Sequence, residues 1–364
     1  MSERKSNFEL LRIISMLFII SFHYVYKSNF YFENLNYNSF IVKSFYFFGE
    51  LGVNLFILIT GYFMIKSKFS YKKLILLITC VNFYYLISVI LGYFLEINYF
   101  DYNLKNILLS FFPCLFNRYW FITSYIIIYI LSPYINKFIY SLSKNQYRKF
   151  LVIILLIWCF IPTFFGLLYN SSEKMLYYSR FIWLLIMYFV GSYIRLYSLN
   201  FYKKKKYIIL VGLISYVVMI SSIVFISIYS NIFKKIGTVE VAYLWSPNNI
   251  FMFLLSISIF GYFINLNIKN SKIINTLAST TLGIYMIHDG LLNRYIWDRL
   301  NTFNKLNSNF SILYIIFDTI IIFLVCSIIE YVRKKVEKKI LVPVIDSIND
   351  KRINKFINKL LKKI

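Results

Sequence analysis

Long apolar segments constrain this chain more than any other feature of its sequence. Ten stretches of mostly apolar residues follow one another along its 364 residues. A helix of about 20 apolar residues crosses the roughly 30 Å hydrocarbon core of a bilayer. We therefore predict an all-α integral membrane protein, a bundle of about ten transmembrane helices. The expected spans are residues 8–26, 45–65, 73–97, 119–140, 149–169, 178–197, 207–230, 248–266, 274–293 and 311–333.

The composition excludes other classes of protein. The chain is 59% hydrophobic and 15% charged, whereas a soluble domain is about half apolar and about a quarter charged. The low hydrophobicity of disordered chains is missing, and four cysteines at unrelated spacings do not form a disulfide framework. The net charge of +25 is divided among short loops and one tail, so we expect no nucleic-acid partner.

The distribution of basic residues predicts the orientation. With the N-terminus inside, 28 of the 40 Lys and Arg residues fall in inner segments and 11 in outer loops, as the positive-inside rule requires. We predict a multi-pass protein of the cell (plasma) membrane with both termini in the cytoplasm. Residues 1–333 form the transmembrane domain. Residues 334–364 form a basic amphipathic cytoplasmic tail, which either contacts anionic lipids of the inner leaflet or is a solvated topology anchor.

Two polar residues interrupt the first expected span. Arg12 and His23 lie eleven positions apart, so they differ by about 20° around a helix and by about 16.5 Å along its axis. They therefore share one helical face. Ionisable residues inside a membrane are costly and mark functional sites, although an arginine near a helix end can also extend to the interface and His23 can be an interfacial polar residue.

Both histidines and three carboxylates are expected at a similar depth in the outer leaflet. Counting about 1.5 Å per residue from the expected span boundaries places His23, Glu50, His288, Asp289 and Asp318 in one layer. A histidine with a carboxylate partner is a general-base arrangement, which makes these residues catalytic candidates. Zinc is the competing interpretation, but the sequence has no HExxH spacing, so we expect no metal.

A basic run joins the second and third expected spans beside the inner end of the first. Lys66, Lys68, Lys72 and Lys73, together with Arg12, are candidates to bind phosphates of a cytosolic donor. The alternative is that the lysines serve only as a topology signal. The sequence has no GxSxG, Walker A or GxGxxG motif that would indicate a serine hydrolase, an NTPase or a dinucleotide enzyme.

Four stretches resemble the membrane acyltransferase-3 family. Arg12 and His23 match its Arg-x10-His pattern, and residues 49–63 (GELGVNLFILITGYF) resemble its G-x-x-G-V-x-L-F…S-G-Y segment. Residues 117–139 (NRYWFITSYIIIYILSPYINKFI) and 279–294 (STTLGIYMIHDGLLNR) are similar to its Trp-Phe…Leu-Ser-Pro span and its late G-I-Y-x-I-H element. The order and spacing of the four stretches agree with the family.

The resemblance implies a bacterial membrane enzyme that modifies cell-surface glycans or related molecules. Its co-substrate would be acyl-CoA, such as acetyl-CoA, bound from the cytoplasm. Its acceptor would be a hydroxyl of an extracytoplasmic glycan or of a lipid-linked molecule. His23 would be the base, and Arg12 would serve the donor or the reaction. Two details depart from the family: Thr60 stands where Ser is usual, and residues 65–74 (IKSKFSYKKL) contain only lysines where some relatives have an Arg-x-x-Arg pair.

Two other classes of function remain open at this point. Buried charges along a pathway also suit a transporter or flippase of a glycolipid or acylated intermediate. A non-catalytic partner in glycan assembly is the third class. A partner of this kind would not require Arg12 and His23 on one helical face. Their presence on one face therefore argues against this class.

Overall fold

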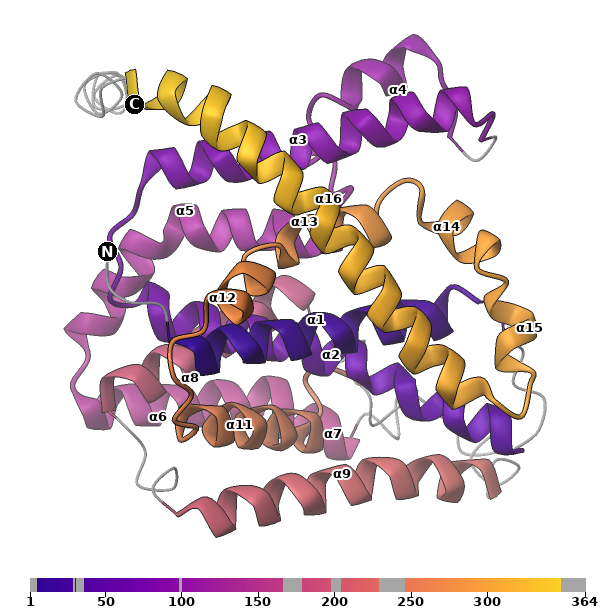
Figure 1. The fold of residues 1–364 in the computed structure, drawn as a ribbon. Helices are drawn as coiled ribbons and strands as arrows, with labels where there is room; N and C mark the ends of the chain where they lie inside the picture. The colour runs from indigo at the N-terminus through magenta and orange to yellow at the C-terminus, as the bar shows by residue number, and fades with distance from the viewer. Residues whose placement is uncertain are drawn as a thin grey trace.

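A computed structural model describes residues 5–28, 30, 36–97, 100–165, 179–197, 204–228 and 246–347. Within these ranges the chain is helical and contains no strand. Figure 1 shows how the helices are arranged. They are α1 (Ser6–Tyr26), α2 (Tyr37–Met64), α3 (Tyr71–Phe94), α4 (Leu104–Leu109), α5 (Trp120–Ser141), α6 (Lys144–Leu155), η1 (Leu156–Phe160), α7 (Ile161–Phe165), α8 (Arg180–Tyr197), α9 (Lys205–Ile228), α11 (Ile250–Ile264), α12 (Lys272–Ala278), α13 (Thr281–His288), α14 (Asn293–Arg299), α15 (Thr302–Leu306) and α16 (Ser311–Ser347).

Eight helices of the described chain are long and apolar enough to cross a membrane. They are α1, α2, α3, α5, the continuous helix Lys144–Phe165 made of α6, η1 and α7, and α8, α9 and α16. Two of the ten expected spans differ from this pattern. The segment expected at 248–266 is α11, an apolar helix of 15 residues. The segment expected at 274–293 is not one helix, because it divides into α12 and α13.

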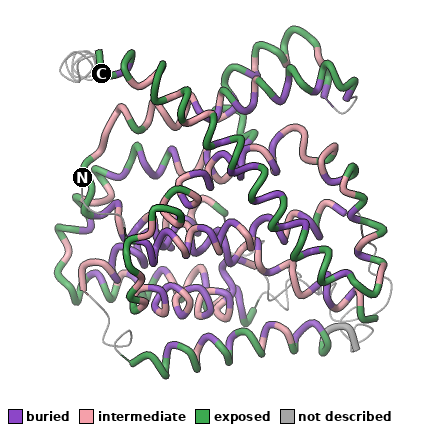
Figure 2. Tube along the Cα trace, in the orientation of Figure 1, coloured by how far each residue is buried: buried purple, intermediate pink, exposed green. Residues whose placement is uncertain are grey.

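The centre of the bundle consists of α1, α2 and α8, while α3, α9 and α16 lie at its periphery (Figures 1 and 2). Most residues of the central helices are buried, whereas the peripheral helices expose large apolar side chains such as Phe94, Leu213 and Phe317. Apolar side chains on the outside of a helix bundle match a lipid solvent, which does not penalise them. The protein is a multi-pass membrane protein.

Glycines allow the central helices to approach closely. A Cβ on Gly52 of α2 would lie 2.5 Å from the backbone oxygen of Ser15 in α1. A Cβ on Gly61 would lie 2.3 Å from the backbone oxygen of Tyr188 in α8. Small residues at helix interfaces permit such backbone contact in membranes. Two glycines of the 49–63 stretch thus bring α1 and α8 against α2.

Side chains of α16 form hydrogen bonds with the polar groups at the break between α12 and α13. Lys334 donates to the backbone oxygen of Ser279 over 2.6 Å, and the hydroxyls of Thr280 and Ser327 lie 3.1 Å apart. Non-helical backbone at membrane depth is tolerated where protein buries it and satisfies its polar groups. The break allows α13 to end at His288 inside the bundle.

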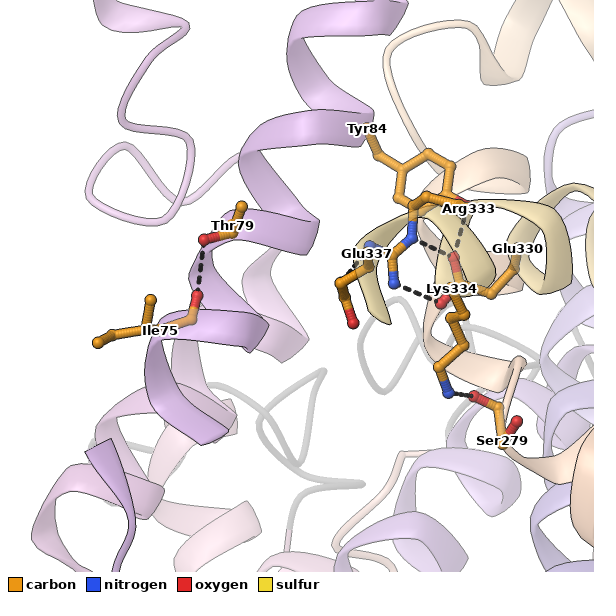
Figure 3. A network of polar contacts seen from close by, with 8 residues as sticks. All are labelled: Ile75, Thr79, Tyr84, Ser279, Glu330, Arg333, Lys334 and Glu337. Atoms are coloured by element: carbon orange, nitrogen blue, oxygen red, sulfur yellow. Dashed lines mark hydrogen bonds and ion pairs between the residues drawn. The ribbon is translucent and has the colours of Figure 1, made fainter. Parts of the chain in front are cut away.

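A buried ion-pair network joins α3 and α16 (Figure 3) and packs against α13. Glu330 is 1% exposed and accepts from Tyr84 over 2.6 Å and from Arg333 over 2.6 and 2.9 Å. Arg333 also binds Glu337. The Glu330 carboxyl group packs against the bare backbone of Gly283, where a Cβ would come within 2.5 Å of it. The network therefore holds α13 against α16.

The helix α16 continues past the expected end of the transmembrane domain at residue 333. It runs for 37 residues to Ser347, and its Asp346 pairs with Lys72 near the start of α3. Residues 348–364 of the expected basic tail lie outside the described residues. The division into a domain of 1–333 and a tail of 334–364 stays a prediction.

Candidate active site

Three of the predicted site residues meet at the end of α13. The Nδ1 atom of His23 on α1 lies 3.0 Å from Nε2 of His288, and Nε2 of His23 lies 3.7 Å from Oδ1 of Asp289. His288 is the last residue of α13, and Asp289 follows it as the C-cap. His288 is fully buried, while the side chains of His23 and Asp289 are 11% and 15% exposed. The sequence predicts a similar depth for these three residues, and in the structure they also lie next to one another.

The hydrogen bonds of the two rings determine which nitrogen carries each proton. The Nδ1 atom of His288 lies 2.6 Å from the backbone oxygen of Ile284. A carbonyl only accepts, so this Nδ1 carries the proton and Nε2 of the neutral ring is an acceptor. His23 then donates from Nδ1 to His288, which leaves the lone pair of His23 on Nε2. That nitrogen can take a proton, and Asp289 lies where it would stabilise the resulting imidazolium.

A cavity of about 420 Å³ runs along one face of α1. Arg12, Met16, Ile19 and His23 line it, and these positions follow one another at helical spacing. The shared face predicted for Arg12 and His23 is therefore the wall of one cavity. Residues of α2, α3, α5, α13 and the first turn of α8 form the other walls. The same cavity therefore extends from Arg12 to His23.

The Arg12 end of the cavity is basic. Arg12 and Lys73 line it, and the Nε atom of Arg12 is buried without a hydrogen-bond partner in the described structure. The other lysines of the predicted donor site lie elsewhere. Lys72 pairs with Asp346, and Lys66 and Lys68 are exposed and do not line the cavity.

At the other end, Glu50 lines the cavity beside two residues that the sequence did not single out. Its Oε1 atom lies 3.1 Å from Nη2 of Arg180, whose guanidinium lies 5.0 Å from the centroid of the Trp120 ring. Trp120 belongs to the family-like stretch 117–139, and Arg180 lies near the expected boundary of the span 178–197. These two positions were visible in the sequence, but neither position indicated that Trp120 and Arg180 share a cavity with His23.

Asp318 is placed apart from the histidine pair. Its Oδ2 atom accepts from Lys305 over 2.7 Å and from the hydroxyl of Tyr24 over 3.0 Å. It is buried and does not line the cavity. A carboxylate that is paired in this way fixes the ends of α1, α15 and α16 relative to one another, and the geometry does not bring it to His23.

The described residues contain no cluster of three or more His, Cys, Asp or Glu side chains arranged to hold a metal ion. The four cysteines are unpaired.

A helical membrane bundle with a buried histidine facing a cavity fits the class of membrane acyltransferases. A comparison with protein families identifies the chain directly: an acyltransferase domain of the acyltransferase-3 family matches residues 5–331. The chain belongs to the acyltransferase-3 family. No curated protein and no solved structure matches it. The matched range includes α1, α13 and all but the last part of α16, and thus every residue of the site described above.

Proposed function

We propose that this membrane acyltransferase transfers an acyl group from cytosolic acyl-CoA to a hydroxyl of an extracytoplasmic glycan or lipid-linked acceptor. The acyl group that we propose is acetyl. The observation that carries the proposal is one cavity lined by both Arg12 and His23. The two residues lie about 16.5 Å apart along the axis of α1, a distance comparable with an extended pantetheine arm. A donor held at one end would thus present its thioester at the other.

The donor would enter at the basic end of the cavity. Arg12 and Lys73 line that end, and guanidinium and ammonium groups bind phosphate oxygens through charge-assisted hydrogen bonds. The unpartnered Nε of Arg12 supports a role in binding, because a buried donor without a partner is costly. Lys66 and Lys68 are exposed and would contribute only long-range attraction.

The chemistry would take place at His23. Its Nε2 removes the proton of the acceptor hydroxyl while the hydroxyl oxygen attacks the thioester carbonyl carbon. The carbon–sulfur bond breaks, and the CoA sulfur leaves and takes the proton back from His23. The products are an ester and free CoA, with no covalent enzyme intermediate. His288 holds the His23 ring in the productive tautomer, and Asp289 stabilises its charged form.

The proposed orientation has the basic end of the cavity and both termini in the cytoplasm of the plasma membrane. The excess of Lys and Arg in the inner segments supports it. In Figure 1, α1 begins and α16 ends on the left side of the bundle, so one orientation accounts for both ends. The His23 end then faces the outer leaflet, where the acceptor would be found.

Isotope-labelled acetyl-CoA tests the proposal with the purified full-length protein in liposomes and crude cell-envelope glycans as acceptor. We expect label on an envelope component with the wild type and not with His23→Ala or the near-isosteric His23→Asn. Thermal unfolding should show that both variants remain folded. A folded wild type that transfers no label from any of several acyl-CoA donors would contradict the proposal and favour the transporter or partner functions.

A further inference from the structure

The end of the cavity near His23 carries a compact set of polar and aromatic groups. Arg180 lies between Trp120 and Glu50, at 5.0 Å from the indole centroid and 3.1 Å from a carboxylate oxygen. All three side chains line the same cavity as His23. The Glu50 side chain is 14% exposed and that of Arg180 is 45% exposed, so the ion pair extends from the protein interior towards its surface.

The set is assembled from three helices that meet at this level. Trp120 and Arg180 are the first residues of α5 and α8, and Glu50 lies within α2. Glu50 follows Gly49, whose lack of a side chain leaves room for the ring of Phe22. A Cβ on Gly49 would lie 2.4 Å from this ring. Phe22 directly precedes His23, so this contact places Glu50 beside the turn of α1 that carries His23.

A chain of rings connects the same set to His288. Phe121 follows Trp120, and its ring lies 6.0 Å from that of Tyr285. The Tyr285 ring lies 6.2 Å from that of His288. Both Phe121 and Tyr285 line the cavity. Glu50, Arg180, Trp120 and His23 therefore line one cavity, and the ring of Tyr285 connects its wall to His288.

The charges at this end favour the phosphates of the donor less than the opposite end does, because Glu50 and Arg180 form an ion pair. Glu50 would repel a phosphate, whereas Arg12 and Lys73 attract one at the opposite end. The chemistry suits a sugar instead. A carboxylate has about four lone-pair sites, so Glu50 can accept from hydroxyl groups while it pairs with Arg180. Arg180 donates to ring and hydroxyl oxygens, and Trp120 provides an apolar surface for the C–H face of a sugar ring.

We propose that Glu50, Arg180 and Trp120 form the acceptor subsite and bind a sugar ring that carries a hydroxyl next to the one that is acylated. Glu50 accepts a hydrogen bond from this neighbouring hydroxyl, Arg180 pairs with Glu50 and holds it in place, and Trp120 packs against the ring. The inference rests on the proposed transfer of an acyl group at His23. It adds that the acceptor is recognised as a polyhydroxylated ring and not as a simple alcohol or a lipid chain.

Steady-state kinetics of the full-length protein in nanodiscs test this inference. Labelled acetyl-CoA is the donor, and the acceptors are a panel of methyl hexosides, n-octanol and a crude cell-envelope glycan extract. We expect transfer to at least one methyl hexoside and to the extract, and little transfer to n-octanol. Glu50→Gln should raise the KM for the hexoside about tenfold, the loss expected for one charge-assisted hydrogen bond. The KM for acetyl-CoA should not change.

Two further variants separate recognition from folding. Trp120→Phe keeps an aromatic surface and should retain most of the affinity that Trp120→Ala loses. Asp298→Asn is the matched control for Glu50→Gln, because Asp298 is an exposed carboxylate that pairs with Arg294 and does not line the cavity. It should leave both KM values unchanged.

The outcomes distinguish this inference from the function on which it rests. A wild type that acylates neither the extract nor any defined acceptor contradicts the proposed function itself. Transfer with a hexoside KM that Glu50→Gln and Trp120→Ala leave unchanged contradicts the acceptor subsite alone. So does transfer to n-octanol that is as efficient as transfer to the hexosides.

Discussion

His288 donates from Nδ1 to the carbonyl oxygen of Ile284, one turn earlier in α13. This contact is local, yet it determines the protonation of a second ring, because Nε2 of His288 then accepts from His23 over 3.0 Å. The nitrogen of His23 that remains unprotonated is the one near Asp289. A backbone carbonyl on one helix thus sets the tautomer of the candidate base on another.

Removing the acceptor nitrogen of His288 should lower turnover without weakening donor binding. His288→Phe keeps a ring but leaves His23 free to adopt the other tautomer, so we expect kcat to fall by about a hundredfold, the lower end of the range for loss of a general base. The KM for acetyl-CoA should stay constant. Nitrogen NMR of labelled His23 should find the proton on Nδ1 in the wild type and a mixture in the variant. A wild type with the proton on Nε2 would contradict the assignment.

Asp289→Asn should slow the reaction by removing the charge that stabilises the His23 imidazolium. The carboxylate oxygen lies 3.7 Å from Nε2, close enough to attract a charged ring in a low-dielectric site. We expect kcat to fall by about tenfold or more, since each 1.4 kcal/mol changes a rate tenfold. Single-turnover measurements of acyl transfer check this. An unchanged chemical step would remove Asp289 from the mechanism.

Arg12→Lys should weaken donor binding although the positive charge is kept. Lys is a point charge and cannot reproduce the fork of donors that a guanidinium offers to phosphate. We expect the KM for acetyl-CoA to rise by about tenfold, measured by initial rates. Arg148→Lys is the matched control, because Arg148 is exposed at the start of α6 and does not line the cavity. Equal effects of the two substitutions would argue against a specific contact at Arg12.

Glu330→Gln should destabilise the fold and displace α13. Glu330 is buried and holds Arg333 and Tyr84 while it packs against Gly283. Removing one partner of a buried ion pair costs about 3 kcal/mol or more, so thermal unfolding in detergent should occur at a lower temperature. Asp346→Asn in the same helix removes a half-exposed pair with Lys72 and should have little effect. Similar unfolding temperatures for the two variants would contradict this role of the network.

Helical periodicity and depth predict part of the geometry of the candidate site from the sequence. The eleven-residue separation of Arg12 and His23 predicts a shared face, and both residues line one cavity. The depth estimate predicted that His23, His288 and Asp289 share a layer, but depth alone contains no lateral information. Asp318 has the same expected depth and nevertheless pairs with Lys305.

Features that depend on backbone geometry were not available from hydropathy. The segment 274–293 is mostly apolar and therefore predicts one span. The break at Ser279 and Thr280 is instead stabilised by Lys334 and Ser327 of α16, which lie far away in the sequence. The hydrogen bond from His288 to the backbone oxygen of Ile284 cannot be predicted from a pattern of side chains. Arg180 and Trp120 stand near expected span ends, where such residues are common as interfacial anchors, and only their shared position with Glu50 distinguishes them.

The most direct test of the central claim separates donor and acceptor by the bilayer. Proteoliposomes enclose labelled acetyl-CoA, the envelope glycan extract is added outside, and Tyr37→Cys labelling with an impermeant reagent reports how many molecules present the His23 end outward. The account predicts label on the external glycan with the wild type, in proportion to the outward fraction, and none with His23→Ala. Label that appears only when acetyl-CoA and glycan are on the same side would contradict transfer through the cavity between Arg12 and His23.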